Sequence, residues 1–143
     1  MARSIRPDHY RPLLVVTGLI LALLLPGLAT AASTRIAASG QAGYRGVLEF
    51  AASPLRTMRP TAFTLTLYDA TGLETTAPDP SCSLVMPAMA MPENRPRLTR
   101  ASGHFAGEAI FTMAGAWQML VTLRRDGAEV DHLTFDIDRV FLK

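Results

Sequence analysis

The sequence predicts an all-β domain, an immunoglobulin-like antiparallel β-sandwich of about seven strands. Three observations support this prediction. Short runs in which apolar and polar residues alternate recur from about residue 44 onward, and a period of two is typical of half-buried strands. Pro, Gly and Asp separate these runs, and no amphipathic helical pattern follows residue 32. A small barrel is the alternative architecture.

An N-terminal apolar segment precedes this domain. Three arginines lie among residues 1–12, residues 13–25 carry no charge, and a Pro-Gly pair and small residues follow up to residue 32. This layout predicts an apolar helix that serves as a secretory signal peptide. An uncleaved membrane anchor is the alternative, because residues 13–32 are close to the roughly 20 residues that span a bilayer. The arginines keep their end inside, so we expect a periplasmic or otherwise extracytoplasmic protein, with membrane contact if the segment is retained.

The basic character of the chain depends on this segment. The whole chain has a net charge of +2, and residues 1–32 hold three of the 14 basic residues and one of the 12 acidic ones, which leaves 11 of each. A neutral domain without a basic stripe lacks the electrostatic attraction on which nucleic-acid binding depends. We therefore expect no nucleic-acid partner.

The domain itself is expected over residues 44–143. Residues 33–43, rich in Ala, Ser and Gly, are predicted to form a flexible spacer. The first strand is expected over residues 44–52, where Ser53-Pro54 ends it. In the second, Phe63, Leu65 and Leu67 alternate with threonine and tyrosine, which predicts one buried and one wetter face.

The remaining elements follow in order along the chain. Residues 69–72 are predicted to form a turn and residues 73–80 a loop into a strand around Cys82. Two short strands are then expected over residues 98–101 and 104–112. The clearest core strand covers residues 117–123, and Asp126-Gly127 after it is a strong signal for a two-residue hairpin turn. The last strand is expected over residues 129–142.

The segment 82–92 is the best candidate for chemistry. It contains the single cysteine, Cys82, together with Met86, Met89 and Met91. Thioether and thiolate sulfur prefer soft ions such as Cu(I), so the segment predicts a copper(I) site. Core packing or partner contact is the alternative, because methionine fills irregular gaps. In a strand, Met89 and Met91 lie on one face and Met86 lies on the other. The three side chains can therefore converge on one metal ion only if the chain turns at Pro87-Ala88.

Two further residues, His104 and Met113, are candidate ligands beside Cys82. His104 is expected to point outward, because Phe105 is the apolar neighbour, and it either completes a copper site or is a plain surface residue. Met113 precedes the core strand and could lie beside the site. Cys82 shares strand parity with Leu84 and Met86, which favours a core position over ligation. A single cysteine cannot form an internal disulfide.

Other conspicuous residues are given structural roles. Trp117 is predicted to be the central core aromatic, and Met58 and Met119 are predicted to fill the core. His132 alternates with the apolar residues of the last strand and is expected to be exposed.

Three motifs in order resemble the YtkA-like and FixH-like family of exported domains. They are the methionine and proline motif of residues 86–92, Gly-His-Phe at 103–105 and Gly-Ala-Trp at 115–117. The resemblance covers about residues 44–140, and the family's methionine motif falls on Met86, Met89 and Met91. It implies a small β-sandwich outside the cytoplasmic membrane, with a part in copper handling or in the assembly of respiratory oxidases.

The sequence favours a binding protein over an enzyme. It contains no nucleophile elbow, no His-Glu-x-x-His helix, no phosphate-binding glycine loop and no second cysteine. We therefore expect a copper carrier, buffer or assembly factor whose partner is a copper-receiving or respiratory membrane protein. The alternative is a module without metal that docks a membrane or envelope protein through the methionine and proline loop.

Overall fold

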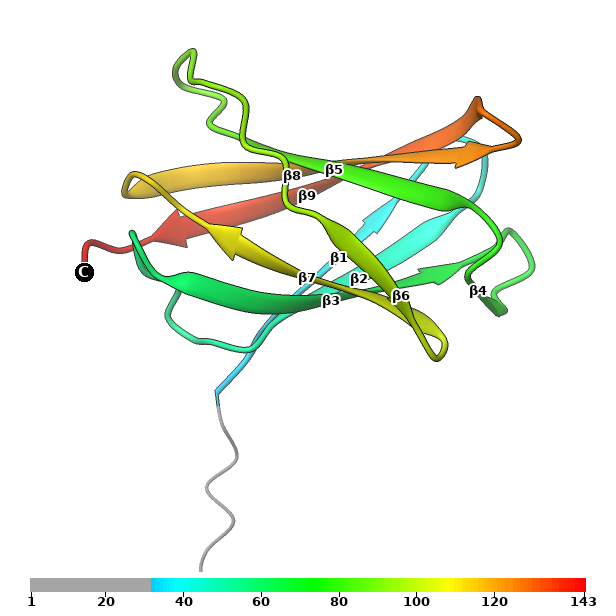
Figure 1. Cartoon of the computed structure of the whole chain (residues 1–143), viewed down its shortest axis with the longest axis horizontal. Helices are drawn as coiled ribbons and strands as arrows, with labels where there is room; N and C mark the ends of the chain where they lie inside the picture. Colours follow the sequence, from blue (N-terminus) through cyan, green and yellow to red (C-terminus); the bar gives the residue numbers. More distant parts are fainter. Residues whose placement is uncertain (1–31) are drawn as a thin grey trace, which may run out of the picture. The chain divides into compact units, whose positions relative to one another are not determined.

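The computed structural model describes residues 32–143 (Figure 1). The predicted signal peptide or anchor therefore lies, except for its last residue, outside the described residues. No helix within residues 32–143 is long and apolar enough to cross a membrane. This part of the chain forms nine strands: β1 (Thr34–Ser39), β2 (Arg45–Phe50), β3 (Pro60–Tyr68), β4 (Glu74–Thr75), β5 (Asp79–Val85), β6 (Leu98–Ala101), β7 (His104–Ile110), β8 (Gly115–Arg125) and β9 (Ala128–Val140).

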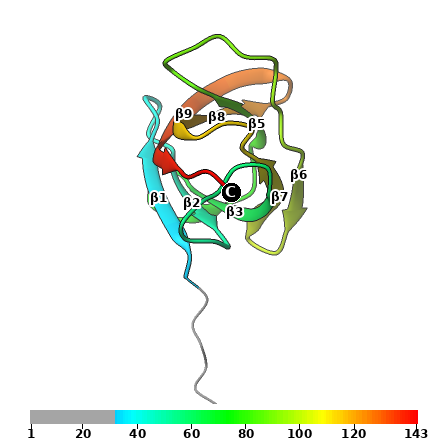
Figure 2. The ribbon, with the colours of Figure 1, turned by 90° about the vertical axis from the view of Figure 1, so that its left-hand side faces the viewer.

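The strands form two sheets that pack face to face (Figures 1 and 2). The larger sheet has the order β1-β2-β3-β7-β6, with β4 paired to β3, and the smaller has the order β5-β8-β9. All strand pairs are antiparallel. The prediction of an all-β, sandwich-like domain is confirmed, and all seven predicted strands are present.

Two additional strands correct the predicted boundaries. The expected flexible spacer contains β1, which pairs with β2 from Thr34↔Phe50 to Ser39↔Arg45, so the folded domain starts ten residues earlier than predicted. Its small residues have low strand propensity, so the sequence signal for β1 is weak. Pairing with β2 and the packing of Ile36 against the core hold the strand in place instead. The predicted loop 73–80 likewise contains β4 and the first two residues of β5.

The core lies between the sheets and follows the predicted alternation. Trp117 is 1% exposed, and its ring meets Phe111 edge-on at a centroid distance of 5.5 Å. Met119, two residues further on, is fully buried. Both findings confirm the core roles predicted for these residues. Antiparallel strands with one inward face leave the polar partners, such as His132, exposed as expected.

The predicted turns close one end of the sandwich. In the β8–β9 hairpin, Asp126 and Gly127 have φ values of 53° and 81°, as a turn with two left-handed central residues requires. In the turn after β3, the Gly72 amide donates to the Asp69 carbonyl at 2.9 Å. The Thr71 hydroxyl and the backbone amides of Leu73 and Thr71 also donate to the Asp69 carboxylate, and these bonds lower its pKa.

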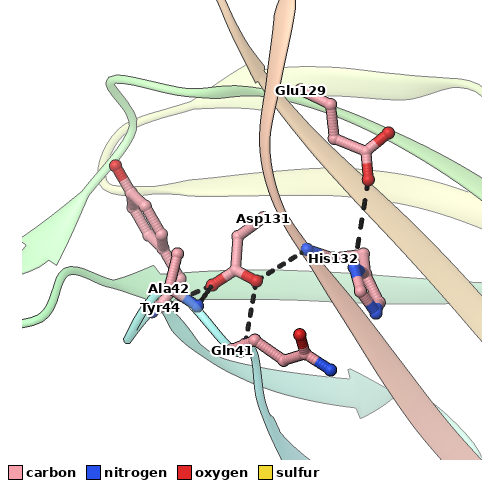
Figure 3. A network of polar contacts seen from close by, with 6 residues as sticks. All are labelled: Gln41, Ala42, Tyr44, Glu129, Asp131 and His132. Carbon is pink, nitrogen blue, oxygen red and sulfur yellow. Dashed lines mark hydrogen bonds and ion pairs between the residues drawn. The ribbon is translucent and has the colours of Figure 1, made fainter.

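A buried carboxylate joins β9 to the turn between β1 and β2 (Figure 3). Asp131 is 5% exposed and accepts hydrogen bonds from the backbone amides of Gln41, Ala42 and Tyr44 at 2.9 to 3.2 Å. A Cβ on Gly40 would collide with the Asp131 Oδ2 atom, so only glycine fits there. One carboxylate thus satisfies three turn amides and connects the two sheets along this side.

An ion pair connects the sheets on the other open side. Arg100 of β6 contacts Asp79 of β5 at 2.7 Å, and its guanidinium also lies over the Phe105 ring, 5.4 Å from the centroid. Both partners are solvent-exposed, so the pair itself adds little stability. The Arg100 guanidinium does cover one face of the Phe105 ring.

Candidate functional site

Four segments far apart in the sequence meet at one end of the sandwich. They are residues 51–59, 86–97, 111–114 and 141–143. The Met58 amide donates to the Phe111 carbonyl at 2.8 Å and the Thr57 amide to the Phe141 carbonyl at 2.9 Å. The Asn94 side-chain amide donates to the carbonyl of Ile110 at 2.9 Å. We call this the methionine end, and Figure 2 looks onto it.

The loop between β5 and β6 supplies three methionines to this end. The Met89 amide donates to the Met86 carbonyl at 3.3 Å, so the chain turns at Pro87-Ala88. This is the turn that the three methionine side chains need if they are to converge. Met86 points into the core, 8% exposed, with its methyl group against Gly115. Met91 is half-buried against the core, whereas Met89 is 48% exposed.

Two other loops each contribute one methionine. Met113 is 38% exposed, and its carbonyl accepts a hydrogen bond of 2.9 Å from the Trp117 indole, which fixes the β7–β8 turn. Met58 is 62% exposed at a φ of 56°, so the prediction that it fills the core is wrong. Nothing in its sequence neighbourhood indicates this, because the β2–β3 loop is ordered by its contacts with Phe111 and Phe141. Five of the six methionines among residues 32–143 therefore lie at this end.

Cys82 lies in the core beside the loop. It is 6% exposed, and its thiol donates to the Pro96 carbonyl at 3.3 Å. Burial raises the pKa of the thiol to about 11. A metal takes cysteine as the thiolate, so this environment opposes ligation, and the core position agrees with its strand parity.

His104 lies at the opposite end of the sandwich from the methionines. It begins β7, whereas Ile110 ends that strand beside the 86–97 loop. Six residue steps along a strand amount to about 20 Å. Its Nδ1 atom lies 3.0 Å from the Ser102 carbonyl, and Phe105 is buried as predicted. The structure therefore does not bring His104 to Met86, Met89, Met91 or Met113.

The donors gathered at the methionine end are thioethers. Among residues 32–143, no group of three or more His, Cys, Asp or Glu side chains is placed to hold a metal ion. Met89 and Met113 present their side chains to solvent, and Met91 lies partly beneath the surface. Thioether sulfur is neutral and soft, which matches Cu(I) better than harder divalent ions.

No family model matches this chain, and neither the curated proteins nor the solved structures contain a significant match.

Proposed function

We propose that this protein is an exported, periplasmic copper-binding protein that holds Cu(I) at the methionine end. It would act as a carrier, a buffer or an assembly factor for a copper-receiving or respiratory membrane protein. The observation that supports the proposal is that methionines from separate loops meet at one end of the sandwich, three of them more than one third exposed. The resemblance to YtkA-like and FixH-like domains, with their immunoglobulin-like scaffold, agrees with this role.

Exposure divides the four methionines that the sequence marked as candidate ligands into two groups. Met89, Met91 and Met113 are the proposed ligands, because exposed or half-buried methionine side chains can reorient around three rotatable bonds. Met86 lies beneath them in the core and joins only if its side chain turns outward. His104 is omitted because of its distance, and Cys82 because burial keeps its thiol protonated.

A competition titration tests the proposal. The full chain in detergent is titrated with Cu(I) under reducing conditions against a chromophoric copper(I) chelator. We expect one copper per chain, and we expect loss of binding when Met89, Met91 and Met113 are all replaced by leucine. Because thioethers release no proton on binding, the affinity should change little between neutral and mildly acidic pH.

The matched control is Met119→Leu. It makes the same chemical change at a methionine that is buried in the middle of β8, and methionine-to-leucine changes in a core usually cost less than about 1.5 kcal/mol. This variant should bind copper as the parent chain does. Unchanged binding in the triple variant, and in a quadruple variant that includes Met86→Leu, would exclude the methionine site.

A further inference from the structure

Exposed apolar side chains are concentrated at the methionine end. Among residues 32–143, seven large apolar side chains are exposed, and one of them, Leu73, lies in the turn after β3 at the opposite end. Monomeric proteins scatter single apolar residues over their surface, whereas a gathered set marks an interaction site. The six at the methionine end are Met58, Met89, Ile110, Met113, Phe141 and Leu142.

Basic side chains surround part of this apolar set. Arg56 and Arg59 flank Met58, and Arg139 and Lys143 flank Phe141 and Leu142. All four basic side chains are exposed, and none forms an ion pair within the part of the chain that the structure describes. The Arg56 guanidinium donates to the Leu142 carbonyl at 3.0 Å, so the two basic segments lie against each other.

The charges of these segments contrast with those of the opposite end. Residues 51–59 contain no acidic side chain, and residues 138–143 contain only Asp138. At the opposite end, the turn segments 69–74 and 126–131 carry five acidic side chains against none that is basic. Arg45 and Arg125 lie beside these turns, so the opposite end carries charges of both signs. The two segments at the methionine end are mainly basic, and the exposed apolar residues lie beside them.

Both arginines of the β2–β3 loop line a surface pocket. Its volume is about 470 Å³, and Arg56, Arg59 and the start of β3 line it. Two arginines at one pocket suit a phosphate, which arginine binds through paired N–H donors. The phosphate of a lipid headgroup has this chemistry.

The described part of the chain also starts at this pocket. Ala32 is among its lining residues, and the Thr34 hydroxyl donates to the Ala52 carbonyl at 2.9 Å. Covalent geometry allows the residues between the uncharged run 13–25 and Ala32 to span at most roughly 25 Å. If that run is held in a bilayer, the end of the sandwich that stays near the bilayer is the basic, apolar one.

We propose that the methionine end docks onto the surface of an anionic lipid bilayer. Met58, Phe141 and Leu142 enter the interface, while Arg56, Arg59, Arg139 and Lys143 face the lipid phosphates. Apolar side chains flanked by basic ones are the combination by which peripheral segments bind anionic membranes. This inference is independent of the copper proposal, whose ligands are Met89, Met91 and Met113.

Site-specific fluorescence on the full chain tests the docking. In a Cys82→Ala background, an environment-sensitive fluorophore is attached through Met58→Cys, through Leu142→Cys or, as the matched control, through Leu73→Cys. Each protein is reconstituted into vesicles of phosphatidylcholine and phosphatidylglycerol whose acyl chains carry bromine, with a copper chelator present. We expect several-fold stronger quenching at positions 58 and 142 than at position 73.

The contribution of the basic residues is measured in the same assay. Removing phosphatidylglycerol, or introducing Arg56→Gln together with Arg59→Gln, should reduce the quenching at position 142 while the N-terminal segment is unchanged. Equal quenching at positions 58 and 73 would overturn the proposal. So would quenching at position 58 that persists without the anionic lipid and without both arginines. Absence of quenching at every position would also overturn it.

Discussion

The two ends of the sandwich carry different kinds of loop. At the opposite end the turns are short and internally hydrogen-bonded, with carboxylates such as Asp69 and Asp131 accepting from turn amides. At the methionine end the loops are longer, and they present Met58, Met89 and Leu142 to solvent. Folding explains the residues of the turns at the opposite end, because the turns need residues that accept their backbone geometry and carboxylates that accept hydrogen bonds from their amides. It does not explain exposed methionines, and this contrast is why both proposals are placed at the methionine end.

The largest effect is expected when the carboxylate of Asp131, which organises the opposite end, is removed. In Asp131→Ala, the amides of Gln41, Ala42 and Tyr44 lose their acceptor, and we expect the free energy of unfolding to fall by about 3 kcal/mol. Urea denaturation followed by tryptophan fluorescence measures this change. Asp138→Ala, which removes an exposed carboxylate from the same strand, should change stability by less than about 0.5 kcal/mol. Similar losses in both variants would show that Asp131 does not organise the turn.

The titration of Cys82 tests whether the 86–97 loop is closed over the core. The folded state holds the thiol pKa at about 11 rather than 9.0, so below pH 9 the thiol is protonated in both states and its contribution is constant. As the pH rises from about 9 to about 11, the unfolded chain loses this proton first, and stability should fall by at most about 2 to 3 kcal/mol.

Chemical denaturation at several pH values measures this loss. The control is Cys82→Ala, which has no thiol, so its stability should fall less over the same range. Parallel pH profiles for the two proteins would mean that the thiol is as accessible in the folded state as in the unfolded chain.

The smallest effect is expected at the exposed apolar residues. Met58→Gln and Leu142→Gln replace side chains that are 62% and 71% exposed, so each should change the free energy of unfolding by less than about 0.5 kcal/mol. Thermal or urea unfolding of the two variants provides the measurement. A loss above 1 kcal/mol in either variant would show, by the usual range for surface substitutions, that the side chain serves folding, and would weaken the contrast between the ends.

Much of the fold could be predicted because alternation and turn chemistry are local signals. Phe63, Leu65 and Leu67 face the core as their spacing indicates, and Asp126-Gly127 forms the predicted hairpin turn. The strand β1 escaped prediction because its small residues depend on pairing with β2 rather than on their own propensity. The burial of Asp131 could not be predicted for a related reason, since the amides that it accepts from lie about ninety residues away in the sequence.

The candidate site was predicted in composition but not in arrangement. The 82–92 segment indicated soft sulfur and a turn at Pro87-Ala88, and the turn is present. Strand parity indicated an inward Met86, and Met113 was expected beside the site. The sequence alone could not reveal that Met58 lies at the same end or that His104 lies at the other. Such placements depend on strand order and direction, which no local pattern specifies.

By itself, the sequence determined the all-β class, the positions of seven strands, the core role of Trp117 and the sulfur-rich character of the 82–92 segment. These follow from side-chain periodicity and local turn chemistry, which act over a few residues. Only the tertiary structure decided that one end of the sandwich is rich in methionine and other exposed apolar residues, while the other end is closed by hydrogen bonds within its turns. That division arises because antiparallel pairing brings loops from distant parts of the chain to the same edge of the sheets.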